Sequence, residues 1–139
     1  MKEQKKQILQ VLGKRIQQDV EKEQFDFSCL QEIRLRTGKP LTVLYRGKEK
    51  LLTKVEQEDI RETLEYISNY SLYAYENEMR QGFITIEGGH RVGMAGKVVM
   101  EEGKIKNLKY ISSINVRVAH EVKGCADRLF PYITKERQI

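Results

Sequence analysis

The segment from residue 82 to residue 118 constrains the fold of this chain more than any other stretch. Half of the chain's ten glycines fall between Gly82 and Gly96, and the residues from Phe83 onward alternate between apolar and polar. Such alternation is typical of β-strands, and glycines within strands usually mark bulges or a close approach of two backbones. The segment is therefore predicted to be strands and turns.

A phosphate-binding loop is the other structure that a glycine cluster suggests. A Walker A loop needs Gly, four residues and then Gly-Lys-Ser/Thr, so that amides hold the phosphates and a hydroxyl reaches magnesium. Here Gly96-Lys97 is followed by Val98, and Arg91 stands five residues before Gly96. We expect the chain alone neither to hydrolyse ATP nor to bind it tightly, and we assign it no catalytic residue and no cofactor.

Length and charge set further bounds. The 139 residues predict a single domain, residues 1–139, with enough chain for a real core. The net charge of +5 permits acidic partners such as nucleic acid, anionic lipid or nucleotide phosphates. No apolar run approaches the roughly 18 residues of a membrane span. The two cysteines and two histidines have no close metal-ligand spacing, so no metal site is predicted.

The apolar periodicity predicts an α+β fold with small mixed or antiparallel sheets and packed helices. Residues 1–28 form a helical lead-in, residues 30–81 a ββ(β)αα unit, and residues 82–133 a β-meander with a terminal helix. One amphipathic helix is expected to run through Gly13, because apolar residues recur at helical spacing at Ile8, Leu12, Ile16 and Val20.

The later elements follow from the same patterns. Strands are expected at 32–36, 41–46 and 50–53, and helices at 55–69 (started by Thr53 or a polar neighbour) and 72–80. The meander strands are expected at 83–87, 91–100, 104–108 and 110–119, with a hairpin turn at 101–103 and a last helix near 126–133. The predicted core residues are Ile33, Leu35, Val43, Ile60, Leu64, Ile67, Val92, Val116 and Val118.

Side-chain parity then separates core residues from surface residues on the strands. It places Arg91, Gly93, Ala95, Asn115 and Arg117 on the outer face, opposite the apolar residues of the same strands. The small outward residues leave room for another chain element to dock closely. On the earlier strand, Glu32, Arg34 and Arg36 are also expected to face outward.

Three segments of the chain resemble the N-terminal half of the stage III sporulation protein AA family. They read EIRLRTGKPLTVLYRGK, YENEMRQGFITIEGGHRVGMAGKVV and ISSINVRVAHEVKGCADRLFPYI, and the resemblance covers about Leu30 to Ile133. This family is similar to the hexameric traffic ATPases of type II secretion and type IV pili. In the family the Walker A loop follows a region like Leu129–Ile133, so the chain resembles an isolated N-terminal domain.

The resemblance implies a role beside an ATPase. In the secretion motors, arginines of the N-terminal sheet reach the bound phosphates, and the matching positions here are Arg91 and Arg117. Arg34, Arg36 and Arg46 are further candidates; His90 either positions an anion or is a turn residue with an exposed ring. An arginine fork suits phosphate well and stabilises developing charge. ATP and Mg belong to the full-length protein.

The implied partners are the protein's own C-terminal ATPase domain, neighbouring subunits of a hexamer and other stage III sporulation proteins. The implied location is the mother-cell cytoplasm, at the outer forespore membrane. The alternative is a nucleic-acid-binding module, because Gly93-Met94-Ala95-Gly96 fits the GXXG loop of a KH domain. That loop belongs between two helices, whereas this one lies in a β-like run, so nucleic acid is the less favoured partner.

Overall fold

The computed structural model describes residues 2–70, 82–96, 99–101, 104–107 and 111–120. In this part of the chain, three α-helices pack on a six-stranded antiparallel sheet of order β3-β2-β1-β8-β5-β4, and a short 3-10 helix, η1, precedes β1. Strands β6 and β7 form a separate antiparallel pair. The α+β prediction is confirmed. The elements are α1 (Lys2–Leu9), α2 (Lys14–Lys22), η1 (Phe27–Cys29), β1 (Leu30–Arg36), β2 (Pro40–Tyr45), β3 (Lys48–Lys54), α3 (Gln57–Tyr70), β4 (Phe83–Thr85), β5 (Arg91–Gly96), β6 (Val99–Glu101), β7 (Lys104–Asn107) and β8 (Ile111–Arg117).

The predicted single N-terminal helix is wrong, because the chain breaks into α1 and α2 before Gly13. The Gly13 amide donates to Thr63 Oγ1 at 2.9 Å, and the Lys14 amide donates to Glu62 Oε1 at 2.6 Å. Side chains of α3 therefore satisfy amides at the start of α2 that no helix residue can reach. The four apolar residues that predicted the helix are nevertheless all fully buried.

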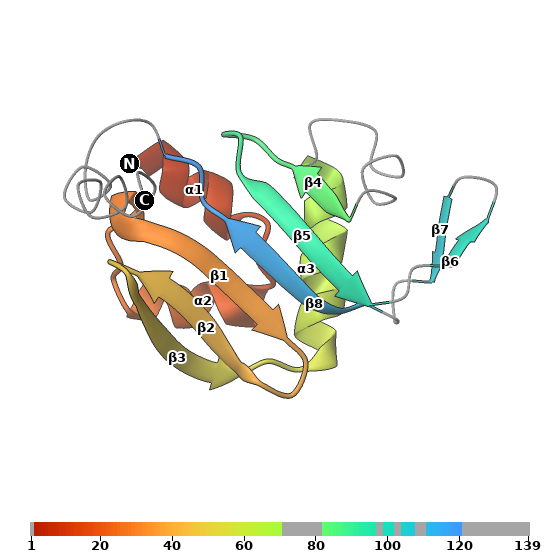
Figure 1. The fold of residues 1–139 in the computed structure, drawn as a ribbon, viewed down its shortest axis with the longest axis horizontal. Coiled ribbons are helices and arrows are strands. Elements are labelled where there is room, and N and C mark those ends of the chain that lie inside the picture. The colour runs from red at the N-terminus through yellow and green to blue at the C-terminus, as the bar shows by residue number, and fades with distance from the viewer. Residues whose placement is uncertain (1, 71–81, 97–98, 102–103, 108–110, 121–139) are drawn as a thin grey trace, which may run out of the picture.

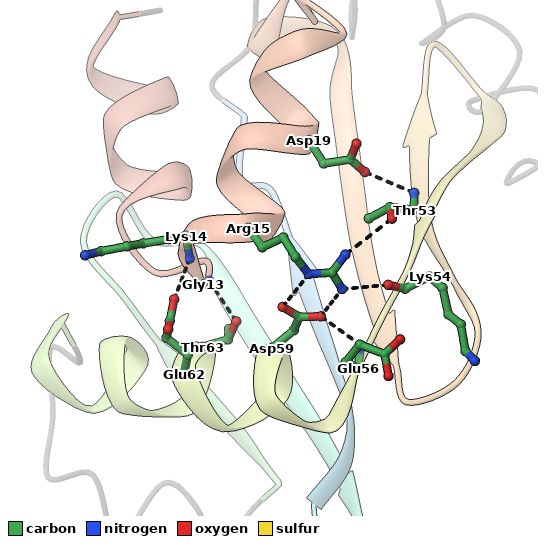
Figure 2. A network of polar contacts seen from close by, with 10 residues as sticks. All are labelled: Gly13, Lys14, Arg15, Asp19, Thr53, Lys54, Glu56, Asp59, Glu62 and Thr63. Carbon is green, nitrogen blue, oxygen red and sulfur yellow. Dashed lines mark hydrogen bonds and ion pairs between the residues drawn. The ribbon is translucent and has the colours of Figure 1, made fainter.

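A polar cluster joins α2 to α3 and β3 (Figure 2). Arg15 pairs with the buried carboxylate of Asp59 and donates to the carbonyl of Lys54. Asp59 also accepts from the Glu56 amide at 2.8 Å, so it caps the start of α3, while Thr53, the expected cap, donates its amide to Asp19. These contacts fix the orientation of both helices against the sheet.

The first three strands lie close to their predicted positions. Their turns contain Gly38 and Gly47, with φ of +78° and +79°, a backbone conformation that glycine adopts without steric cost. Helix α3 begins at Gln57 and buries the predicted stripe of Ile60, Leu64 and Ile67. The predicted helices at 72–80 and 126–133 lie outside the described residues.

The last part of the sheet is not a simple meander. Strand β8 pairs with β5 on one side and with β1 on the other, so it joins the two predicted units into one sheet. The predicted strand 91–100 is interrupted between β5 and β6, where the β5–β8 register shifts at Gly96 and Gly96 has φ of +132°. In Figure 1 the β6–β7 hairpin projects from the end of β5 and β8, away from the main sheet.

The sheet has one covered face and one open face. Helices α1, α2 and α3 lie behind the strands in the view of Figure 1. The nine residues predicted to form the core all belong to the buried apolar cluster between sheet and helices. The near face of the sheet is covered by no described helix, and this face presents the outward side chains of the strands.

Candidate functional site on the open face of the sheet

The strand register aligns side chains from all six strands of the main sheet in two rows across the open face. The first row runs through Glu49, Leu44, Glu32, Arg117, Arg91 and Thr85. The second row runs through Leu51, Thr42, Arg34, Asn115, Gly93 and Phe83. Neighbours within a row have Cβ atoms roughly 5 Å apart, so these side chains act on one another directly.

Arg91 and Arg117 are direct cross-strand neighbours in the first row. Both are exposed, and both point away from the core, as parity predicted. Like charges in this position oppose each other and destabilise the sheet. A local arrangement that costs stability is expected where a binding partner compensates for it.

The surroundings of the two arginines differ. The Arg91 guanidinium lies over the Phe83 ring, 5.0 Å from its centroid, which orients it by a cation–π contact. Arg117 Nε lies 3.7 Å from Glu32 Oε1, and the Arg117 side chain remains 73% exposed. Each guanidinium therefore keeps donors that a further anion can use.

Glu32 is the carboxylate that Arg34 and Arg117 contact on the open face, and the sequence analysis did not predict this role. It faces outward as predicted, yet it is only 9% exposed, because Arg34 and Arg117 cover its carboxylate. Arg34 also contacts Glu49 Oε2 at 3.1 Å, and its bond to Glu32 raises the pKa of the guanidinium. The signal was present: Glu32 and Arg34 stand two residues apart on a strand and share one face.

The remaining candidate arginines separate into two groups. Arg36 is exposed on the open face, opposite Ser113 of β8. Arg46 lies instead in the β2–β3 turn with φ of +52°, and its guanidinium stacks on Tyr45, 5.3 Å from the ring centroid. The structure thus gathers Arg34, Arg36, Arg91 and Arg117 on one face and leaves Arg46 at its end.

The second row contains an unused acceptor. Asn115 Oδ1 is buried and has no hydrogen-bond partner among the described residues. Beside it, Gly93 presents bare backbone, because it carries no side chain. In the register, Gly93 and Asn115 lie between Arg34 and Phe83. That these small residues leave room for a closely docked chain element stays a prediction.

The expectation that His90 has an exposed ring is wrong. The residue is 1% exposed and contacts α1 on the covered side of the sheet. Its Nδ1 accepts from the Ala119 amide at 2.9 Å, and its Nε2 lies 2.9 Å from Gln7 Oε1. Burial, together with the nearby His120, lowers the pKa of His90. His90 therefore does not face an anion bound on the open face.

The described part of the chain contains no cluster of metal ligands: within it, no three or more His, Cys, Asp or Glu side chains come together. No helix in these residues is long and apolar enough to cross a membrane. The segment Gly93–Gly96 lies in strand β5, as predicted, and not at the start of a helix.

The fold and this face define a two-layer α+β domain with an arginine-rich open sheet. Comparison with known proteins identifies the family: Sporulation stage III, protein AA, matches residues 2–139, and the chain belongs to it. Stage III sporulation protein AA of Bacillus subtilis (strain 168) is 41% identical over 105 residues, which cover 75% of this chain and 34% of that protein. Membership assigns the chain a role in sporulation, and the chain spans about a third of this curated relative's length.

Proposed function

We propose that this chain is the non-catalytic N-terminal domain of a sporulation ATPase of the secretion-motor type. In this proposal the rest of the protein carries the Walker A loop and binds ATP and Mg. The domain supports ring assembly, as a hexamer, and contributes arginines near the nucleotide of its own or a neighbouring subunit. The matched region covers 34% of the relative, so that protein has enough further length for a catalytic domain.

The observation that carries the proposal is the cross-strand pair Arg91–Arg117 on the open face. Two adjacent, exposed guanidinium groups repel each other in the isolated domain, and a phosphate that accepts charge-assisted hydrogen bonds from both offsets that repulsion. In phosphoryl transfer, an arginine supplied across a boundary stabilises the charge of the transition state. Such an arrangement makes hydrolysis depend on correct assembly.

We place the assembled protein in the mother-cell cytoplasm, peripheral to the outer forespore membrane, with other stage III sporulation proteins as partners. This placement rests on the family and not on a feature of the fold. Nucleic acid is the alternative ligand that the same cationic face allows. A gel-shift measurement at physiological salt with single-stranded RNA and duplex DNA separates the two ligands.

The test uses the full-length protein with Arg91→Ala and Arg117→Ala. We expect ATP turnover to fall about tenfold or more, corresponding to loss of about 1.4 kcal/mol or more of transition-state stabilisation. Arg91→Lys and Arg117→Lys retain the charge without the planar fork and should recover turnover only in part.

The matched control is Arg61→Ala, because Arg61 is also exposed but pairs with Glu58 and Glu65 on α3. Its turnover should equal that of the unmodified protein. Unchanged turnover in both Arg91→Ala and Arg117→Ala contradicts the nucleotide role, and so does a full-length protein that hydrolyses no ATP.

A further inference from the structure

His90 forms a side-chain hydrogen bond at the end of the β5–β8 pair, directly beside Arg91 and Arg117. It precedes Arg91 in the chain, and the Ala119 amide that it binds lies two residues after Arg117. The described register between the strands begins at the Arg91–Arg117 pair. The side-chain bond from Ala119 to His90 therefore continues the strand pairing by one step and closes that end of the ladder.

The same ring also ties this end of the sheet to α1. The Ala119 amide can only donate, so Nδ1 must be the acceptor and the ring proton lies on Nε2, which donates to Gln7 Oε1. Gly88, with φ of +95°, passes so close that a Cβ there would lie 2.7 Å from His90 Nε2. The turn, the ring and the helix are thus packed with no spare space.

The groups around the ring offer no compensation for a second proton. From α1 the facing group is the uncharged amide of Gln7, and from the end of β8 it is His120, a second histidine. His120 is itself held, with Nε2 2.6 Å from the Leu30 carbonyl and Nδ1 3.2 Å from Gln4 Nε2. Glu87 is exposed within the β4–β5 turn itself, and Arg91 points to the opposite face.

A proton on Nδ1 would face the Ala119 amide, so the bond between them cannot survive protonation. Burial lowers the pKa of His90 in the closed arrangement, whereas an opened ring has the ordinary value of about 6.5. The open form thus binds the proton more readily. The hydrogen bond from Ala119 to His90 is therefore fully formed above pH of about 6.5 and weakens as the pH falls below that value.

We propose that His90 is a proton-sensitive positioning residue for the arginine pair. In its neutral form it clamps the end of β8 to the β4–β5 turn and to α1, which fixes Arg117 beside Arg91. Protonation opens this clamp, so that the two guanidinium groups lose their common placement. The consequence for anion binding rests on the proposed function, whereas the clamp itself rests on the geometry of His90, Ala119 and Gln7.

The first experiment follows the clamp in the 139-residue chain by NMR between roughly pH 8 and pH 5, the range in which histidine titrates. At the upper limit the His90 nitrogens should report a neutral ring protonated on Nε2. On acidification, exchange of the Ala119 amide, corrected for its intrinsic pH dependence, should accelerate about tenfold or more relative to Val116. Constant protection of Ala119 while the His90 ring titrates overturns the proposal.

A variant isolates the proton from the packing. In His90→Asn the side-chain oxygen can take the place of Nδ1 as acceptor but does not titrate in this range. The protection of Ala119, corrected for the intrinsic pH dependence of exchange, should then be constant with pH. His120→Asn, the matched control, should retain the loss of protection on acidification. The reverse result assigns the effect to His120 and contradicts a role for His90.

The second experiment connects the clamp to the arginines through sulfate, which stays doubly charged over this range. The affinity for sulfate should fall on acidification in the unmodified chain and remain nearly constant in His90→Asn. Sulfate binding that is unaffected by Arg91→Ala and Arg117→Ala contradicts the anion role of the pair but leaves the clamp result intact. If sulfate binding needs both arginines but has the same pH profile in His90→Asn as in the unmodified chain, His90 does not position the arginine pair, and only this part of the proposal is overturned.

Discussion

Thr63 Oγ1 accepts the backbone amide of Gly13 at 2.9 Å, so a side chain of α3 caps the start of α2. Thr63 is fully buried, and Thr63→Val should leave the Gly13 amide without a partner. We expect a loss of about 1–3 kcal/mol in the free energy of unfolding, measured with urea.

Hydrogen exchange at the Gly13 amide separates this bond from packing. It should accelerate in Thr63→Val and stay slow in Thr63→Ser, which keeps the hydroxyl. Equal protection in the two variants would show that another group caps α2.

Asp26 should make stability depend on acid pH. Its carboxylate accepts from the hydroxyl and the amide of Ser28, and these bonds lower the pKa of Asp26. Because the folded pKa lies below the unfolded one, the stabilisation is present above pH of about 4 and is lost as the pH falls through the folded value.

Asp26→Ala should therefore cost about 1 kcal/mol at neutral pH. Asp26→Asn keeps an acceptor for Ser28 without the titration, so it should retain most of the stability and lose part of the acid dependence. Urea unfolding at a series of pH values measures both effects, and identical acid profiles for the Asp26→Asn variant and the unmodified chain would contradict the assignment.

The Arg91–Arg117 pair should weaken the isolated domain slightly. Arg91→Ala should leave the free energy of unfolding unchanged within about 0.5 kcal/mol or raise it, because it removes a like-charge neighbour. Added salt should stabilise the unmodified domain more than the variant, since it screens the repulsion. Arg61→Ala removes favourable pairs and serves as the control. A strongly lowered melting temperature in Arg91→Ala would instead assign this arginine a structural role.

Gly88 and Gly38 form a matched pair for steric effects. Both have positive φ, but an added Cβ at Gly38 meets nothing within 4 Å, whereas at Gly88 it meets Gln7 and His90. Each Ala variant should lose about 1–2 kcal/mol through backbone strain. Gly88→Ala should lose about 1–3 kcal/mol more, because the histidine clamp must move. If urea unfolding shows equal losses for Gly88→Ala and Gly38→Ala, then Gln7 and His90 move aside without lowering the free energy of unfolding.

Part of the candidate site was readable from parity. The alternation around Val92 and Val116 correctly predicted that Arg91 and Arg117 face outward, because side-chain direction in a strand is a local property. Their direct opposition was not readable, because it depends on the register between β5 and β8, two strands separated by the β6–β7 hairpin. The burial of His90 had a signal that went unused: it shares the parity of Val92, which faces the core.

The amino-acid sequence by itself determined which faces of the helices and strands are apolar, since those faces follow from periodicities of a few residues. The tertiary structure decided where the first helix breaks and which strand lies beside β1. Both depend on partners far along the chain: the Gly13 amide finds Thr63, and β8 finds β1 and β5 at once. Long-range hydrogen bonds of this kind leave no local period, and only the packed fold brings their donors and acceptors together.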